Sequence, residues 1–465
     1  DLRVDFNSFL PKNLPNKISK KIIDNSINLL EKNPALHDKV EFKIIDTCFN
    51  FNLDSKKYNF LTIKEKKIYF NELKKITNKV LDPKENLLNK EFNKLNLLED
   101  KIKKINQSNL SHIQKIFFLY NDCKELGTLP FAGIARCAFI STNILLSLEK
   151  KKIFNKDEVK KFYKSLNTIS KDINNIYIKS LKKKNFVFFL NKYGHLRPSM
   201  YSINVDNYKK NFKKYFSKDL SNLKYHNYTK FKLNSKKIKK LNKFFHKEKL
   251  VINFSQFIQF ARKSIEYREQ SKLIFSKSID KIFENLTKLS KEINIKKEDL
   301  KHVDIDLIIN AYNNLSPNKL KKILLKNIQT NKRNYNFAKF IQFPDIVTSI
   351  NDLDYFYNIN SAENYITDFK VTSNVLNISN LKNLGKTQNQ IILIENADPG
   401  YDFLFSNNIS GLITKYGGSN SHMAIRCMEL GIPAIIGIGE KKYNELLGAK
   451  KLFIDCKNNN YKIIL

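Results

Sequence analysis

The sequence predicts a multidomain protein with a mixed N-terminal segment, a mainly helical central region and a compact β-rich domain at its C-terminal end. Three observations lead to this prediction. The 465 residues exceed one ordinary hydrophobic core. Apolar residues recur at three- and four-residue spacing through the centre of the chain, which is typical of amphipathic helices. Short apolar runs replace that pattern near the end, where nine of the 12 glycines lie from Gly385 onward.

The first 110 residues are predicted to be mixed α/β structure. Pro34 predicts a turn, and the run Lys39–Asp46 alternates polar and apolar residues, which is typical of a strand. Lysine-rich segments with helical spacing follow it. Residues 1–110 are therefore expected to form a mixed segment ahead of the helical region.

Residues 111–345 are predicted to be mostly helical. The longest apolar stretch, Leu129–Leu148, contains Arg136. Because a charge is costly inside a bilayer, we interpret this stretch as a buried helix and not as a membrane span. The helical spacing is clearest in Ser111–Cys123, Arg136–Glu149, Lys156–Ser180 and Gln256–Leu289.

The composition changes after Pro344, where an acidic and turn-rich stretch follows. Residues 346–364 are the predicted hinge or linker, and residues 365–465 are the predicted β-rich domain, which has an ordinary domain size. One helix, Ser421–Leu430, is expected among its strands. The predicted strands are Phe369–Thr372, Gln390–Glu395, Gly411–Thr414, Pro433–Gly437, Lys451–Asp455 and Tyr461–Leu465.

The formal net charge of +38 comes from 83 lysine and arginine residues against 45 acidic residues. Only seven of the basic residues are arginine, which is the side chain best suited to phosphate and base-edge recognition. Abundant asparagine and isoleucine point to a compositional bias that spreads lysine over the whole surface. This pattern disfavours nucleic acid as the partner.

The five cysteines are scattered and show no CxxC spacing. They indicate reduced thiols in a cytoplasm and predict neither a disulfide framework nor a metal site. The chain opens without a signal-peptide pattern. We therefore expect a cytoplasmic protein that binds no metal.

A glycine-rich turn between a strand and a helix carries the clearest chemical signal. The strand Gly411–Thr414 leads into Gly417 and Gly418, and Asn420 and Ser421 are both suited to cap the helix that follows. His422 lies in its first turn. The helix is expected to end at Gly431, ahead of a proline.

His422 is predicted to carry chemistry because of this position. Free backbone N–H groups and the helix dipole favour an anion at a helix N-terminus. A neutral imidazole there can attack a phosphoryl group, and Arg426, four residues on, is placed to offer a charge-assisted contact. We expect the site to lie on the surface, so that His422→Asn leaves the fold intact. The alternative is a histidine that merely caps a helix.

The whole string Gly417–Gly437 resembles the phosphohistidine signature of phosphoenolpyruvate-utilising enzymes, such as phosphoenolpyruvate synthase, pyruvate phosphate dikinase and rifampin phosphotransferase. Ile392–Gly400 and Gly411–Tyr416 also resemble the strands that precede the histidine in that family. The resemblance covers roughly residues 365–465. It implies a β/β/α swivelling domain in which His422 carries the phosphoryl group, Ser421 supplies a supporting hydroxyl, and the loop glycines allow close backbone approach to phosphate.

In that family an ATP-grasp domain phosphorylates the histidine, and the small domain then swings to a second site. The sequence contains no glycine-rich ATP-binding loop and no clustered metal carboxylates. We therefore expect ATP and Mg²⁺ on an ATP-grasp partner, located upstream or on another chain, and no cofactor bound by this chain. The order of regions resembles rifampin phosphotransferase, which implies that the helical centre binds a small-molecule or glycan-type acceptor.

Two glycine islands in the helical centre resemble the central part of large bacterial proteins that couple an ATP-grasp half to this mobile domain. They are Leu126–Arg136 and Tyr193–Pro198. Because arginine is scarce, Arg136, His195 and Arg197 are the candidates for an acceptor or anion site. A buried ion pair is the alternative for Arg136. Arg262 and Arg268 are interpreted as solvated helix charges.

The sequence thus favours a phosphotransferase with a phosphohistidine intermediate, incomplete without an ATP-grasp half. The alternative is a non-catalytic, lysine-rich helical module that binds nucleic acid or another anionic polymer and keeps a degenerate histidine domain. The intact Ser421-His422 pair favours the enzyme.

Overall fold

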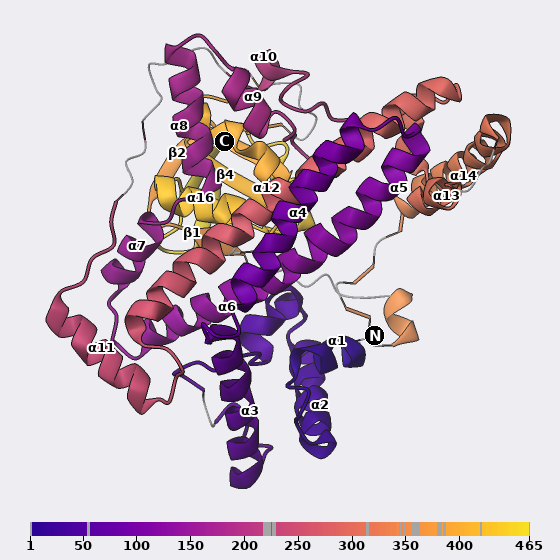
Figure 1. Ribbon diagram of the computed structural model, residues 1–465. Helices are drawn as coiled ribbons and strands as arrows, with labels where there is room; N and C mark the ends of the chain where they lie inside the picture. Colours follow the sequence, from indigo (N-terminus) through magenta and orange to yellow (C-terminus); the bar gives the residue numbers. More distant parts are fainter. Residues whose placement is uncertain are drawn as a thin grey trace.

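The computed structural model describes residues 2–464 except 54–55, 217–224, 226–228, 313–315, 342, 345, 348, 355–362, 379–383, 385–386 and 419–420. The described chain is mainly helical, with one mixed sheet at the C-terminal end (Figure 1). Much of the predicted hinge, including residues 355–362, lies outside the described residues.

The regular elements that the structure describes in the N-terminal segment are all helices. Its elements are α1 (Leu2–Phe9), α2 (Asn16–Lys32), η1 (Pro34–Lys39), η2 (Val40–Ile44), α3 (Ile63–Leu81) and α4 (Leu87–Gln107). The prediction of a strand at Lys39–Asp46 is wrong, because helical turns cover most of this run. The prediction of mixed α/β structure is also wrong for the described part of residues 1–110. The adjacent side chains of Ile44 and Ile45 are both buried in the core formed with α1, α2 and α3. A strand would point them to opposite faces, whereas the end of a helical turn brings both to the same core.

The central region is helical, as predicted. The segment predicted as Lys156–Ser180 is two helices, because the chain turns between Ser165 and Thr168. The elements are α5 (His112–Asp122), η3 (Cys123–Thr128), α6 (Leu129–Lys150), α7 (Lys156–Lys164), α8 (Ile169–Lys182), α9 (Val187–Tyr193), α10 (Phe212–Tyr215), α11 (Ser235–Lys247), α12 (Phe254–Glu292), η4 (Lys297–His302), α13 (Ile305–Asn310), α14 (Pro317–Ala338) and η5 (Ile350–Leu353).

Helix α12 is the spine of the central region. It runs for 39 residues and begins at a capping box, in which the Asn253 side chain accepts from the Gln256 N–H and the Gln256 side chain accepts from the Asn253 N–H. It lies against α4, α5 and α6 (Figure 1). The ring of Tyr267 stacks on Phe92 of α4 with centroids 3.8 Å apart. The central core is built along this helix.

The helical stretch His112–Lys150 is long and apolar enough to cross a membrane, but 56% of its most apolar window is buried inside the protein. Helix α6 packs inward through residues such as Ile134, Ile140 and Leu145. These features are those of a core helix, and the described residues give no clear membrane-protein signal.

The C-terminal domain is a seven-stranded mixed sheet in the order β1-β5-β4-β3-β2-β6-β7. Its centre, from β2 to β5, is parallel, and β1, β6 and β7 pair antiparallel at the edges. The six predicted strands are found, and β1 is an additional one. The strands are β1 (Asn364–Ile366), β2 (Lys370–Asn377), β3 (Ile391–Asn396), β4 (Gly411–Tyr416), β5 (Ala434–Ile436), β6 (Lys451–Asp455) and β7 (Asn460–Ile464).

Helices cover both faces of this sheet. Helix α17 (Glu440–Leu446) packs on one face with Ile391 and Ile413. The other face carries η7 (Pro399–Tyr401), α15 (Phe403–Ser406) and α16 (His422–Leu430). The core on that second face continues into side chains of the central region such as Phe189 and Tyr208. The C-terminal domain is therefore seated on the central region through a shared apolar core (Figure 1).

Candidate active site around His422

The strand, turn and helix around His422 form as the sequence predicts. Strand β4 ends at Tyr416, and Gly417 turns the chain with a φ of +135°, a conformation that side-chain-bearing residues rarely adopt. The Ser421 hydroxyl caps α16 by accepting from the Ala424 N–H at 3.3 Å. Gly431 ends the helix in the left-handed region. His422 is thus the first residue of α16; Asn420 lies outside the described residues.

The His422 imidazole is buried between two carboxylates, and only 3% of its side chain is exposed. Its Nδ1 lies 2.6 Å from Glu269 Oε2, and its Nε2 lies 2.9 Å from Asp402 Oδ1. Asp402 follows η7 in the same domain, whereas Glu269 comes from α12 of the central region. The expectation of a surface histidine was wrong, because the second domain closes over it.

The charges of this cluster favour a protonated histidine. Burial disfavours the charged imidazolium, but Asp402 and Glu269 together outweigh it and raise the pKa of His422 to about 10. Burial likewise opposes ionisation of Glu269, and His422, Arg268 and Lys272 overcome it, so that the pKa of Glu269 falls to about 2. The sequence led us to expect a neutral imidazole, whereas this arrangement favours a protonated His422. Nucleophilic attack requires His422 to lose its proton.

Arg426 shares the His422 face of α16, as its spacing predicts. Its Nε lies 3.4 Å from Asp402 Oδ1, and its guanidinium lies 5.0 Å from the centroid of the Phe405 ring. The side chain is almost fully buried. In this structure Arg426 thus contacts the same carboxylate as His422.

The two loop glycines differ in what surrounds them. A Cβ on Gly417 would lie 2.7 Å from the Ala397 Cβ, and one on Gly437 would lie 2.2 Å from the Gly417 carbonyl oxygen. A Cβ on Gly418 would meet nothing within 4 Å. Gly417 is therefore required by the turn itself, whereas the open position of Gly418 is the one that leaves room for a ligand beside the backbone.

Basic side chains of α12 complete the cluster. Arg268 Nη1 lies 3.8 Å from Glu269 Oε1, and the Arg268 side chain is largely buried. Burial and the nearby Arg268 lower the pKa of Lys272. The interpretation of Arg268 as a solvated charge was wrong. Arg262 also has a partner, since its Nη2 donates to the Ser165 hydroxyl at 2.8 Å.

Sequence reasoning missed Glu269, Asp402 and Lys272. One signal was present: Glu269 stands four residues after Ile265 and four before Leu273, on the apolar stripe of α12. A carboxylate on a buried stripe demands a cationic partner. The identity of the cationic partner depends on how the two domains pack together. Helical spacing within one domain does not reveal this packing.

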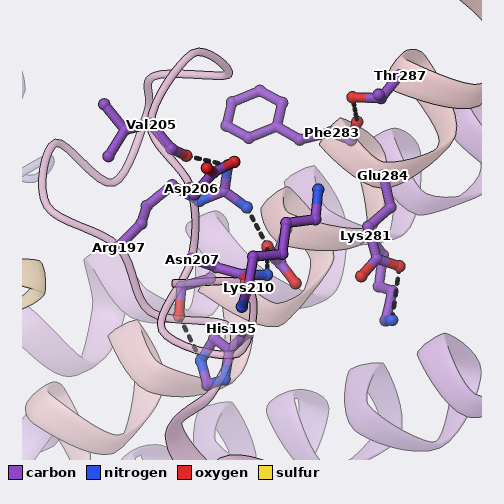
Figure 2. Close-up of polar contacts among 12 residues, drawn as sticks. His195, Arg197, Val205, Asp206, Asn207, Lys210, Lys281, Phe283, Glu284 and Thr287 are labelled. Carbon is purple, nitrogen blue, oxygen red and sulfur yellow. Dashed lines mark hydrogen bonds and ion pairs between the residues drawn. The ribbon is translucent and has the colours of Figure 1, made fainter. Parts of the chain in front are cut away.

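Of the three predicted acceptor candidates, the structure places His195 and Arg197 on one loop (Figure 2) and Arg136 elsewhere. Arg136 Nη1 lies 2.8 Å from Glu41 Oε1, beside the N-terminal segment. His195 and Arg197 lie instead against later turns of α12 (Figure 2). The His195 Nε2 is 3.1 Å from the Ser276 hydroxyl, and burial lowers its pKa to about 3. Arg197 forms a buried ion pair with Asp280.

The C-terminal unit is a domain that presents one histidine from the start of a helix and brings it to a second domain. Residues 386–459 match the family model described as the mobile domain of PEP-utilising enzymes. The match covers the C-terminal domain and confirms, for these residues, the resemblance drawn from Gly417–Gly437. No curated protein matches the chain.

Proposed function

We propose that this chain is the phosphocarrier and acceptor-binding part of a phosphotransferase, with His422 as the carrier. The mobile domain suggests a phosphohistidine role in general. The observation that carries the finer proposal is the 2.6 Å contact between His422 and Glu269. It places the reactive ring of one domain against a charged cluster of another, as a carrier that delivers its group to a second site requires.

The proposed transfer has two half-reactions, one at the ATP-grasp partner and one at the central region of this chain. In the first, a neutral ring nitrogen of His422 attacks the terminal phosphorus of ATP on an ATP-grasp partner, the N–P bond forms and the P–O bond to ADP breaks. In the second, an acceptor hydroxyl attacks the same phosphorus and the N–P bond breaks. The acceptor proton passes to a base, and Glu269 is placed for that role.

The α12 cluster suits the second half-reaction. Arg268 and Lys272 supply positive charge next to Glu269, and positive charge stabilises a phosphoryl group in transfer. Arg426 would support the phosphate from the carrier side. The acceptor site predicted at Arg136, His195 and Arg197 stays a prediction. The intact charged cluster favours the phosphotransferase over a non-catalytic anion-binding module.

The test supplies the chain with an ATP-grasp domain of this family, Mg²⁺ and γ-labelled ATP. We expect label on His422 that is stable in alkali and lost in acid, as phosphoimidazoles are. His422→Asn and His422→Gln should both abolish it. Equal labelling of the wild-type protein and of a folded His422 variant would remove the assignment.

A further inference from the structure

A loop of the mobile domain, residues 398–401, lies directly on a loop of the central region, residues 194–208. A Cβ built on Gly400 would lie 1.6 Å from the Arg197 carbonyl oxygen and 2.9 Å from the Pro198 nitrogen. Real Cβ atoms do not approach backbone this closely, so only glycine permits this contact. The φ of Gly400 is not in the left-handed region, and its own backbone would therefore accept alanine. The requirement for glycine comes from the interface alone.

Polar groups on both sides align the two loops. The Tyr208 hydroxyl donates to the Gly400 carbonyl oxygen at 2.7 Å. The Asp398 carboxylate accepts from the Gly400 N–H at 2.8 Å and also from the Met200 N–H. The hydroxyls of Ser199 and Tyr401 lie 3.5 Å apart. These contacts fix both the distance and the orientation of the mobile-domain loop.

The receiving loop is itself tied to α12. Arg197 Nη1 donates to the Val205 carbonyl oxygen at 3.0 Å, and its Nη2 pairs with Asp280 of α12. The Asn207 amide donates to the same Asp280 carboxylate at 2.9 Å. Figure 2 shows Arg197 and Asn207 reaching from the loop toward the helix, with His195 at its base. The helix that carries Glu269 therefore also holds the loop that receives Gly400.

We propose that residues 194–208 are the docking receptor for the 398–401 loop, and that Gly400 and Arg197 are positioning residues that set where His422 meets Glu269. Gly400 acts by allowing close approach, and Arg197 acts by holding the receiving loop on α12. The docking role is independent of phosphate chemistry, while its effect on transfer rests on the proposed function.

Gly400→Ala in the full chain tests the proposal, with Gly448→Ala as the matched control. Both glycines belong to the mobile domain, but a Cβ on Gly448 would meet nothing within 4 Å. The readout is the pKa of the His422 imidazole, followed by NMR of labelled histidine. The chain has seven histidines, and a His422→Asn sample assigns the signal. Undocking separates Glu269 from the His422 imidazole and therefore lowers the His422 pKa. A variant that is only less stable but keeps the contact would leave this pKa unchanged.

We expect Gly400→Ala to lower the His422 pKa by roughly one unit or more, about tenfold in the protonation equilibrium. Gly448→Ala should leave it unchanged. Tyr208→Phe changes the interface from the central region and should lower the His422 pKa by a smaller amount. This variant provides the test if Gly400→Ala does not fold. An unchanged pKa in both interface variants would overturn the proposal.

Labelling of His422 by the ATP-grasp partner should persist in Gly400→Ala, since the first half-reaction takes place away from α12. A pKa shift without labelling in any protein would leave the docking proposal standing and remove the proposed function. Labelling of His422 together with an unshifted His422 pKa in the interface variants would leave the proposed function standing and remove the docking proposal.

Discussion

The Nδ1 of His422 and the Oε2 of Glu269 lie 2.6 Å apart, although 153 residues of sequence separate them and they belong to different domains. Under the proposed carrier function, this contact would make the protonation of His422 depend on where the mobile domain sits. Docked against α12, the ring contacts the carboxylates of Glu269 and Asp402; away from α12 it would lose Glu269 and keep Asp402, which belongs to its own domain. Position and nucleophilicity are therefore coupled.

Replacing Glu269 should expose this coupling. We expect Glu269→Gln to lower the His422 pKa by about 1–2 units, since a hydrogen bond to a charged group contributes about 1.5–3 kcal/mol. Labelling of His422 should be unaffected. Histidine NMR titration measures the pKa, and Glu284→Gln is the control, because it makes the same change on α12 at a half-buried pair with Lys281. An equal effect of both variants would mean that the helix is perturbed in general.

The docked state should depend on pH with a defined sign. Asp402 and Glu269 overcome the effect of burial and raise the pKa of His422 to about 10. The part that Glu269 contributes to docking is present while His422 is protonated and is lost as the pH rises toward 10. The pKa of Glu269 is lowered to about 2, so its contribution is present above its ordinary value of 4.5 and is lost as the pH falls toward 2. Hydrogen exchange of residues 194–208 should therefore speed up beyond the intrinsic rate at alkaline pH. If His422→Asn shows the same alkaline transition, another group controls it.

The buried carboxylates predict that His422→Asn destabilises the protein. Removing the imidazolium leaves Glu269 and Asp402 facing each other without it, and breaking a buried ion pair costs about 3–5 kcal/mol. Thermal unfolding should show a lower midpoint than the wild type. Adding Glu269→Gln should recover part of the loss, because it removes one of the two negative charges. A double variant less stable than either single one would contradict this account.

Arg197→Lys separates two roles for the arginine. Lysine cannot reach both the Val205 carbonyl and Asp280 in the same geometry. We expect a lower thermal midpoint and a lower His422 pKa, with Arg333→Lys on the exposed face of α14 as a silent control. If stability and the pKa are both unchanged and only transfer slows, Arg197 binds an anion, as its scarcity suggested.

Features of this protein that depend on residues close together in the sequence could be predicted, and features that depend on distant residues could not. The turn and helix from Gly417 to Gly431 were predicted well, because glycine conformations and caps are local. The strand at Lys39–Asp46 was a mistake, because alternation over a short run does not reveal whether a partner strand exists. Glu269 was missed for a different reason: its partner lies on another domain.

Helix α12 has a consequence for how this chain tolerates change in length. Glu269 and Asp280 are eleven residues apart, close to three full turns, so they lie on the same side of the helix. Glu269 contacts His422 of the mobile domain, and Asp280 holds the 194–208 loop that receives Gly400. One inserted residue between them would rotate one contact by about 100° relative to the other. A substitution in this interval leaves the register of the two contacts unchanged, whereas any insertion or deletion shifts one contact around the helix relative to the other.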